Sequence, residues 1–432
     1  MLHLARLINS APLGDPRRNA RALTLTKAML QGQMSGTHGV PGAGGAMPWA
    51  DTVAAFRFFN NDKLSIPALF EPCRQGLAQL LAPQARALVI HDVSVVDYST
   101  HQAKHDLVPV GDGRGLGYEL FTALVLDSQG TPLGSVFQEL RTATGCLSSV
   151  ESALVPFTNH YTQVERAIAA ARTQLPGRCL IHLMDAEFDE LQLLRSTAAC
   201  TERYLVRAQH LRRQVLFQGT PMPLAQVVAH LPLAAAGTLE RQGVRWALFQ
   251  GETFVQFHGP SHRGVARHHQ APRSGPALPV RVVVTELRRP GHKSLQWVLL
   301  TNLTDPLSTV VQYYAWRWRI ERLFYLVKVG FRLEHWHQES APALMRRLAL
   351  TMLAAQLLYQ LLARAQDPSV VPLLRKVATL GGWLGRKRDR MGPLVLMRGM
   401  LLLLGMLSAL ETYGPAELQR LVREFATTFG LV

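Results

Sequence analysis

Residues 313–328, YYAWRWRIERLFYLVK, combine arginines, one glutamate and two tryptophans with enough apolar side chains to contribute to a core. At about 100° per residue, a helix would gather four polar side chains within about 60° on one face, namely Tyr314, Arg317, Glu321 and Lys328. The apolar side chains would gather on the opposite face. The simplest interpretation is an amphipathic helix with an i, i+4 ion pair between Arg317 and Glu321. The alternative is a functional face on which one carboxylate lies among cations, and the rest of the sequence bears on that choice.

The composition indicates a globular protein with a polyanionic partner. The chain has 432 residues, which predicts two or three domains, and 48% of them are hydrophobic, which is enough for a large core. The formal net charge is +16. Such an excess of positive charge favours nucleic acid as the partner, ahead of an anionic membrane surface. A basic protein that is merely soluble is the alternative.

The cysteines and the apolar runs predict a protein of a reducing compartment, the cytoplasm. The four cysteines lie far apart without a CxxC pair, which argues against a disulfide framework or a zinc site. The first residues lack the long apolar core of a signal peptide. The runs LALTMLAAQLLYQLL (348–362) and GMLLLLGMLSAL (399–410) are too short or too interrupted to span a bilayer, so we expect both to be buried helices.

The chain divides into three predicted parts. Residues 1–83 are basic and helical, and would form a DNA-binding domain or, alternatively, a plain helical cap. Residues 84–338 alternate strands and helices as a mixed α/β domain does, with a strand-rich insertion at about 211–295. Residues 339–432 are helical again and are expected to serve in dimerisation.

Three segments are expected to form β-hairpins because two strand-like runs flank turn residues in each. The first, residues 117–140, has a Ser-Gln-Gly turn and belongs to the α/β part. The other two, residues 245–259 and 278–300, lie in the strand-rich insertion or at its end.

Three acidic residues could hold divalent ions. Asp92 and Asp185 each end an apolar run that is typical of a buried strand, and Glu321 lies on the quoted helix. A carboxylate in such a place is costly unless it is paired or binds a cation, and sites in α/β sheets gather beyond the strand ends. Three oxygen ligands without a convincing Cys or His cluster suit Mg²⁺ or Mn²⁺, and the cations of the same helix favour a phosphodiester substrate. Asp97, on the same stretch as Asp92, is the rival for the first position.

The three acids also resemble the DDE triad of RNase H-like transposases. The spacing Tyr314-x-x-Arg317-x-x-x-Glu321-x-x-x-x-x-x-Lys328 is similar to the Y-R-E-K signature of bacterial insertion-sequence transposases of the IS-four family, the group that includes the Tn-five transposase. Shorter motifs resemble the same family: LGDPRRNAR (13–21), DAEFD (185–189) and WVLLTN (297–302). The likeness covers most of the chain and is weakest after about residue 339.

The resemblance implies a fold, a mechanism and partners. The fold would be α/β, with an RNase H-like catalytic core in which helices flank a mixed sheet. Two Mg²⁺ ions, with Mn²⁺ as a substitute, would be held by Asp92, Asp185 and Glu321. The activity would be cut-and-paste DNA transposition, through hydrolysis at the transposon end, hairpin formation, hairpin opening and strand transfer. The partners would be the double-stranded terminal inverted repeats and target DNA, bound by a homodimer at the bacterial nucleoid, with no membrane.

By the same resemblance, aromatic and basic side chains would contact DNA. Trp297 would stack on a flipped base, a contact worth about 1–3 kcal/mol, and Trp318 would help to hold the hairpin. Arg207 would replace an arginine that relatives often carry where this chain has Ala186. The other contacts would come from the signature and the N-terminal part: Tyr314, Arg317, Lys328, Arg17, Arg18 and Arg57. Packing of the insertion against the sheet is the alternative role for Trp297.

Several other polar residues have simpler structural interpretations. Glu187 and Asp189 suit the first turn of a helix as caps or supporting groups, and His91 and His182 suit buried strands. The histidines at 258–269 lie in a Gly- and Pro-rich stretch without the rigid geometry of a metal site.

Two functions besides transposition stay open. An RNase H-like, structure-selective nuclease without strand transfer would use the same acids, but would not need Trp297 or the basic N-terminal part. A catalytically inactive, transposase-derived DNA-binding protein would be expected to have lost one of the three acids, and all three are present. A glycosidase also uses paired carboxylates, but has no need for the cationic face or the charge of +16.

Overall fold

The computed structural model describes residues 3–31, 34, 47–241, 243–257, 277–385 and 391–428. The chain forms two compact units. The sheet unit comprises Arg74–Val95 and Glu119–Arg322, and the helical unit comprises Met1–Cys73, Val96–Tyr118 and Leu323–Val432. Each unit combines segments that are distant in the sequence. The assignment of separate roles to the three predicted parts of the chain stays a prediction.

The sheet unit is a mixed α/β structure in which helices flank a large mixed sheet. Its strands follow the order β5-β4-β3-β1-β6-β7-β13-β12-β11-β8-β9, and β10 pairs with β11. The strands of the first half are β1 (Arg86–Asp97), β3 (Gly115–Asp127), β4 (Pro132–Thr142), β5 (Gly145–Ser148), β6 (Cys179–Met184) and β7 (Arg203–Arg207).

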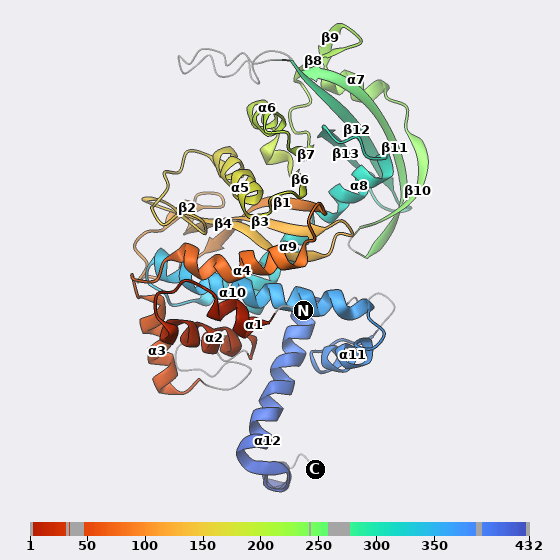
Figure 1. The fold of residues 1–432 in the computed structure, drawn as a ribbon. Coiled ribbons are helices and arrows are strands. Elements are labelled where there is room, and N and C mark those ends of the chain that lie inside the picture. Colours follow the sequence, from red (N-terminus) through yellow and green to blue (C-terminus); the bar gives the residue numbers. More distant parts are fainter. Residues whose placement is uncertain are drawn as a thin grey trace. The chain divides into compact units, whose positions relative to one another are not determined.

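The centre of this sheet is parallel. β1 pairs with β6 from Arg86↔Cys179 to His91↔Met184, and β6 pairs in parallel with β7. Parallel neighbours need crossover connections that cover a face of the sheet. α6 (Leu191–Ala199) is the crossover from β6 to β7, and α5 (His160–Gln174) precedes β6. Figure 1 shows both helices on the same side of these strands.

The strand-rich part follows β7. It contains β8 (Gln214–Phe217), β9 (Thr220–Pro223), α7 (Leu224–His230), β10 (Ala234–Arg241), β11 (Val244–Phe257), β12 (Leu278–Arg288) and β13 (Leu295–Thr301). α8 (Leu307–Trp316) lies against β10 and β11 (Figure 1), and α9 (Arg319–Tyr325) follows it. The histidines at 258–269 lie outside the described residues.

Two of the three predicted hairpins are confirmed. β3 and β4 form the first, with Gly130 at φ +77° in its turn, and β12 and β13 form the third. The prediction for residues 245–259 is wrong, because β11 runs as one strand between β10 and β12. Gly251 lies within this strand. A Cβ atom there would overlap with the carbonyl oxygen of Pro232, so glycine permits close approach of another backbone.

The signature segment is not one continuous helix, contrary to the prediction. α8 and α9 are separated by a turn at Arg317 and Trp318. The Arg317 amide donates to the Tyr314 carbonyl (3.0 Å) and the Ile320 amide to the Arg317 carbonyl (3.2 Å). These i→i−3 bonds wind the chain more tightly than an α-helix does. After α9, residues Leu326–Gly330 (η3) form a wider π-helical segment, so the simple spacing of 100° does not hold along the signature.

The helical unit contains α1 (Leu4–Asn9), α2 (Pro16–Leu30), α3 (Trp49–Phe59), the start of α4 (Ile66–Leu80), β2 (Val108–Val110), η4 (Leu333–His335), α10 (Ala341–Ala363), η5 (Arg364–Gln366), α11 (Val371–Leu380) and α12 (Pro393–Thr428). Asp15 caps α2 by accepting a hydrogen bond from the Arg17 amide at 2.8 Å, and Pro16 occupies the first turn. α2 and α3 pack against α10.

The two apolar runs of the helical unit differ in burial. Residues 348–362 lie in α10, which is buried along most of its length, so the prediction for this run is confirmed. Residues 399–410 lie in α12, and the prediction that they are buried is wrong. Their exposed apolar side chains are Leu402, Leu403, Met406, Leu407 and Leu410.

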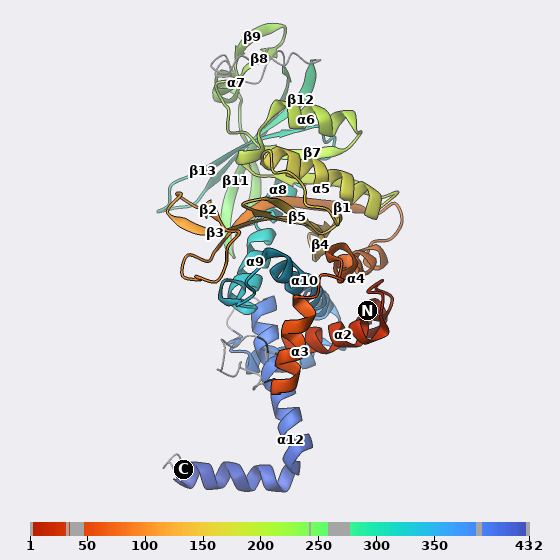
Figure 2. The same cartoon turned by 90° about the vertical axis from the view of Figure 1, so that its left-hand side faces the viewer.

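The exposure of α12 has a structural cause. α12 is contacted by α11, α10, η3 and α2, and the buried residues among its described positions lie within its first turns: Leu396, Met397, Gly399 and Leu401. The segment Pro393–Glu411 is long and apolar enough, by length and composition, to cross a membrane, and 24% of it is buried. Beyond it, Gly414 interrupts α12 with φ 72° and ψ 163°, and Figure 2 shows the resulting bend.

Candidate active site

Two of the predicted acids occupy equivalent positions at the end of the parallel pairing. β1 and β6 pair as far as His91↔Met184, and Asp92 and Asp185 are the next residue of each chain segment. The prediction that Asp92 ends its strand is wrong, because β1 continues to Asp97. Asp92 is instead the point at which pairing with β6 stops. Both carboxylates therefore lie at the edge where the central parallel strands separate, which is where sites of α/β sheets gather.

The three predicted acids contact one guanidinium. Arg317 Nη1 lies 3.2 Å from Asp92 Oδ2. Arg317 Nη2 lies 3.1 Å from Asp185 Oδ2 and 3.3 Å from Glu321 Oε1. The Arg317 side chain is only 13% exposed, so these contacts are shielded from water. Acids from β1, from the end of β6 and from α9 thus come together in the fold, and their catalytic role stays a prediction.

Other predicted residues surround Asp185. The Tyr314 hydroxyl donates to Asp185 Oδ1 at 3.2 Å, and Arg207 Nε lies 3.1 Å from the same oxygen. Trp297 is 7% exposed, and its ring meets that of Tyr314 edge to face with centroids 5.0 Å apart. The indole packs the site in this arrangement, which favours the packing alternative. Base stacking on Trp297 stays a prediction and would require the indole to be uncovered.

Burial raises the proton affinity of the acids. It raises the pKa of the Asp92 carboxyl from 3.8 to about 6, although Arg317 opposes the rise. Burial also raises the pKa of Glu321, again against the effect of Arg317. Three carboxylates share Arg317, and Arg207 adds a second positive charge at Asp185, so negative charge remains in excess. A divalent cation would relieve this excess.

A fourth carboxylate, Glu187, lies near these acids, where the sequence predicted a cap or a supporting group. It belongs to the 3₁₀ turn η1 (Ala186–Phe188) that Asp185 caps. Burial raises the pKa of Glu187, Asp92 raises it further, and His160 opposes the rise. Its position two residues after Asp185 was the available sequence signal. The sequence did not reveal the 3₁₀ turn in which Glu187 follows Asp185.

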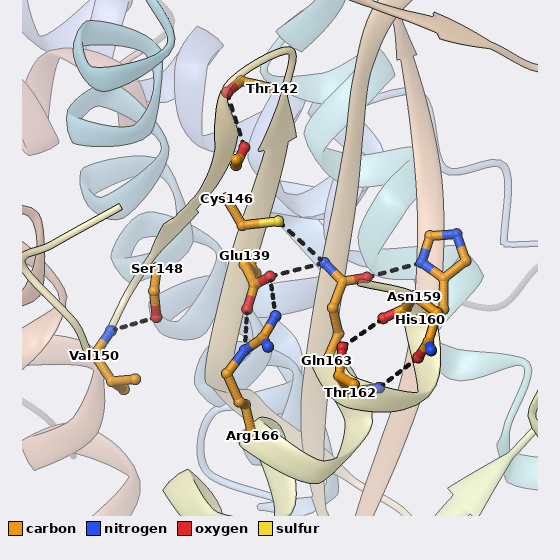
Figure 3. Close-up of polar contacts among 11 residues, drawn as sticks. Glu139, Thr142, Cys146, Ser148, Val150, Asn159, His160, Thr162, Gln163 and Arg166 are labelled. Carbon is orange, nitrogen blue, oxygen red and sulfur yellow. Dashed lines mark hydrogen bonds and ion pairs between the residues drawn. The ribbon is translucent and has the colours of Figure 1, made fainter. Parts of the chain in front are cut away.

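A buried polar network fixes His160 at the start of α5. His160 Nδ1 lies 2.8 Å from Gln163 Oε1, and Gln163 Nε2 donates to Glu139 Oε1 at 3.0 Å (Figure 3). Glu139 on β4 is fully buried and binds Arg166 through Nε (2.9 Å) and Nη2 (2.6 Å). The paired charges hold α5 against β4. The network thereby sets the position of His160 beside the acidic site.

The remaining interior polar residues have structural roles. His91 Nε2 and His182 Nδ1 lie 2.9 Å apart, and both rings are fully buried, so the expectation of core histidines is confirmed. Burial lowers the pKa of both imidazoles, which favours their neutral form. Asp189 is buried, pairs with Arg213 at 2.8 Å and accepts hydrogen bonds from the Gln209 and His210 amides. It therefore anchors the chain that follows β7.

Two charged residues that were predicted or considered as site residues, Lys328 and Asp97, belong to the helical unit. Lys328 lies in the π-helical segment, and its ammonium is 3.2 Å from Glu334 Oε1. Asp97, the rival of Asp92, accepts hydrogen bonds from the Ser99 amide (2.8 Å) and hydroxyl (2.6 Å). These local bonds give Asp97 a turn-stabilising role.

The other predicted DNA contacts lie on helices or near the signature turn. Arg17 on α2 and Arg57 on α3 are exposed, whereas Arg18 donates to the Leu13 carbonyl at 2.8 Å. Trp318 is half-buried, and its indole nitrogen is buried without a hydrogen-bond partner among the described residues. Their contacts with DNA stay predictions.

The donor chemistry of the site fits a hard divalent cation, but its present arrangement does not. Asp92, Asp185 and Glu321 offer carboxylate oxygens, which Mg²⁺ and Mn²⁺ prefer. Within the described part of the chain, no three His, Cys, Asp or Glu side chains are grouped so that they could hold an ion. The three acids instead surround Arg317. Their role as metal ligands stays a prediction.

The chain was also compared with known proteins. No protein-family model matches it. Among solved structures it is similar to the piggyBac transposase in a cryo-EM structure of a synaptic complex with hairpin DNA, with a TM-score of 0.37 and 10% sequence identity. The match covers 83% of this chain and 62% of that chain, so the present chain spans less than two thirds of the length of that transposase. A similarity of this size does not assign a function.

Proposed function

We propose that the protein is a DNA transposase of the cut-and-paste type with an RNase H-like catalytic core. The observation that supports this best is the convergence of Asp92, Asp185 and Glu321 on one buried guanidinium, from elements far apart in the sequence. The Y-R-E-K spacing further supports membership of the IS-four family. The net charge of +16 suits a polyanionic substrate.

The acids would hold the metal, and their neighbours would orient them. When bound, two Mg²⁺ ions would supply activation of water or a 3′-hydroxyl and stabilisation of the departing oxygen. Tyr314 and Arg207, which both contact Asp185, would fix the direction of that carboxylate. Arg317 and Lys328 would bind phosphates of the strand that is cut. The sequence of products would be a nick, a hairpin and a joint with target DNA, made by a homodimer on the terminal inverted repeats.

Replacement of Glu321 tests this proposal. Glu321→Gln keeps the size of the side chain but removes its charge. We expect Mg²⁺-dependent cleavage of the terminal-repeat DNA found beside the gene to fall by more than about a hundredfold, because even an outer partner of a metal ligand typically contributes 10–100-fold. Binding of the same DNA in a mobility-shift assay should change little. Glu151→Gln, at an exposed acid of the sheet unit, is the matched control. Cleavage that survives in Glu321→Gln would overturn the triad.

A structure-selective nuclease without strand transfer is the second candidate. The burial of Trp297 against Tyr314 favours it, because a covered indole offers no face to a flipped base. The two functions differ in their products. Incubation of the cleaved ends with a supercoiled plasmid should yield covalent joints if the protein is a transposase, and only cut DNA if it is a nuclease.

A further inference from the structure

We propose that Arg317 closes the candidate metal site in the absence of DNA and opens it by transferring to a DNA phosphate. Binding of DNA and loading of the metal would then be coupled through one side chain. This inference rests on the proposed function, because it takes Asp92, Asp185 and Glu321 as the metal-binding acids. It concerns what happens at these acids before the metal arrives.

The position of the guanidinium carries the argument. One nitrogen of Arg317 contacts Asp92, and the other contacts both Asp185 and Glu321. The oxygens of Asp185 and Glu321 can therefore be no farther apart than the sum of two hydrogen-bond lengths, with the guanidinium between them. A cation bound to these oxygens would occupy the same region as Arg317. Since arginine does not lose its proton in proteins, the guanidinium can yield this place only by moving.

The lengths of the contacts indicate that three acids each hold Arg317 weakly, and that no single acid holds it tightly. Arginines that pair with a fully buried carboxylate lie closer to it: Arg166 lies 2.6 Å from Glu139, and Arg213 lies 2.8 Å from Asp189. The contacts of Arg317 measure 3.1–3.3 Å. Charge-assisted N–H···O bonds are typically about 2.7–2.9 Å long, so Arg317 forms three weak contacts in place of one strong fork.

Its location in the chain also permits movement. Arg317 lies in the turn between α8 and α9, and is not held in the middle of a continuous helix. A planar guanidinium binds phosphate in the same forked geometry as carboxylate. A DNA phosphate that reaches the site would thus offer Arg317 an equivalent partner. Transfer to that phosphate would leave three carboxylates without their shared cation and with a stronger attraction for a divalent ion.

Thermodynamic linkage makes the proposal measurable. If the phosphate draws Arg317 away, DNA must raise the affinity for metal, and metal must raise the affinity for DNA by the same factor. As a result, the metal site would be complete only when DNA is bound. Free protein would hold little metal.

The first test measures Mn²⁺ binding to the full chain without DNA, by titration calorimetry. Arg317→Gln removes the guanidinium. Arg207→Gln is the matched control, because Arg207 also contacts Asp185 and its replacement by glutamine removes the same positive charge. We expect Arg317→Gln to bind Mn²⁺ about tenfold more tightly than both the wild type and Arg207→Gln, within the range usual for coupled sites. Equal or weaker binding by Arg317→Gln would overturn the proposal.

The second test adds the terminal-repeat duplex. This DNA should raise the Mn²⁺ affinity of the wild type and leave that of Arg317→Gln almost unchanged; an equal rise in both would overturn the proposal. If Arg317→Gln does not fold, Arg317→Lys replaces it, because a lysine keeps the charge but loses the fork, and should bind Mn²⁺ more tightly than the wild type. The proposed function is judged separately by the cleavage assay of Glu321→Gln. Loss of cleavage there, with no Mn²⁺ effect at Arg317, would refute the coupling and leave the transposase proposal standing.

Discussion

Asp92 illustrates how burial sets the charge of the candidate site. Its carboxyl lies at the end of the parallel pairing, is largely shielded from water, and faces Arg317 at 3.2 Å. Removal from water disfavours the ionised carboxylate, while the guanidinium favours it. The pKa of about 6 shows that burial has the larger effect. One arginine that also serves Asp185 and Glu321 does not fully neutralise this acid.

This balance predicts a pH dependence of stability in the metal-free protein. Because the pKa of Asp92 is raised from 3.8 to about 6, the folded protein binds this proton more tightly than the unfolded chain does between those values. The free energy of unfolding should therefore fall as pH rises from about 4 to about 6, by roughly 1–3 kcal/mol. Asp92→Asn cannot ionise at this position, so its slope should be smaller than that of the wild type; the slope that remains comes from Glu187 and Glu321, whose pKa values burial also raises. The variant should be more stable than the wild type at neutral pH. Urea denaturation across this pH range measures both.

Asp97→Asn serves as the control for Asp92→Asn. Hydrogen bonds from Ser99 lower the pKa of Asp97, so its contribution has the opposite sign. The stabilising effect of Asp97 is present above its ordinary pKa and is lost as pH falls. Asp97→Asn should therefore keep the slope that is assigned to Asp92. A slope in Asp92→Asn as large as that of the wild type would contradict the assignment.

At the scale of elements, the turn of the β3–β4 hairpin supports the signature segment. Gly130 in this turn has φ +77°, and a Cβ atom there would overlap with the indole of Trp316 at the end of α8. The apolar residues of the signature are expected to contribute to a core, and Trp316 is half-buried at this contact. Since Tyr314 and Arg317 lie within three residues of Trp316, the hairpin turn helps to set where the signature turn lies.

Replacement of Gly130 tests this support. Gly130→Ala introduces both a strained backbone and an overlap with Trp316, whereas Gly177→Ala, at φ +73° with open space around it, introduces only the strain. We expect Gly177→Ala to cost about 1–2 kcal/mol, as a left-handed conformation does for a residue with a Cβ atom. Gly130→Ala should cost about 1–3 kcal/mol more, because overpacking is added. Equal shifts of the urea midpoint in Gly130→Ala and Gly177→Ala would show that the hairpin turn does not pack against Trp316.

The interrupted signature helix shows the limit of periodicity at this scale. A period of 3.6 residues predicted that Tyr314, Arg317, Glu321 and Lys328 share one face. The i→i−3 bonds at Arg317 and the π-helical segment after α9 change the rotation per residue, so a single period cannot describe the segment. The signature sequence alone did not reveal these changes. Two of the three carboxylates that contact Arg317, those of Asp92 and Asp185, lie outside this segment.

At the scale of the whole molecule, the charge of +16 predicts the mode of DNA binding. Each phosphate neutralised by Lys or Arg releases counterions, so the binding constant should fall linearly with salt on logarithmic axes. A protein with several phosphate contacts should lose at least about tenfold in affinity between about 50 and 200 mM salt. Fluorescence anisotropy with the terminal-repeat duplex measures the slope.

Single arginine variants refine this prediction. Arg17→Gln and Arg57→Gln, at exposed positions of α2 and α3, should each reduce the salt slope by about one if they contact phosphate. Arg420→Gln is the matched control, because this exposed arginine on α12 already pairs with Glu417. A binding constant that does not respond to salt would contradict electrostatic recognition altogether.

The sequence by itself determined the mixed α/β character and the hairpins at 117–140 and 278–300, and it singled out three acids that all contact Arg317 in the fold. These features depend on local chemistry: β-branched runs, turn residues and motif spacing. The sequence could not tell that β1 continues past Asp92 or that β11 is one strand, because strand length is set by pairing with neighbours. It also assigned the apolar run at 399–410 to a core that does not cover it.

Only the tertiary structure decided what the acids face. Asp92, Asp185 and Glu321 lie on segments separated by long stretches of chain, and their distances from Arg317 follow from strand register, from the hairpin turn under Trp316 and from the turn between α8 and α9. A motif lists which charges are present. The electrostatic energy of each charge depends on burial and on distances to partners, which exist only after the chain has folded.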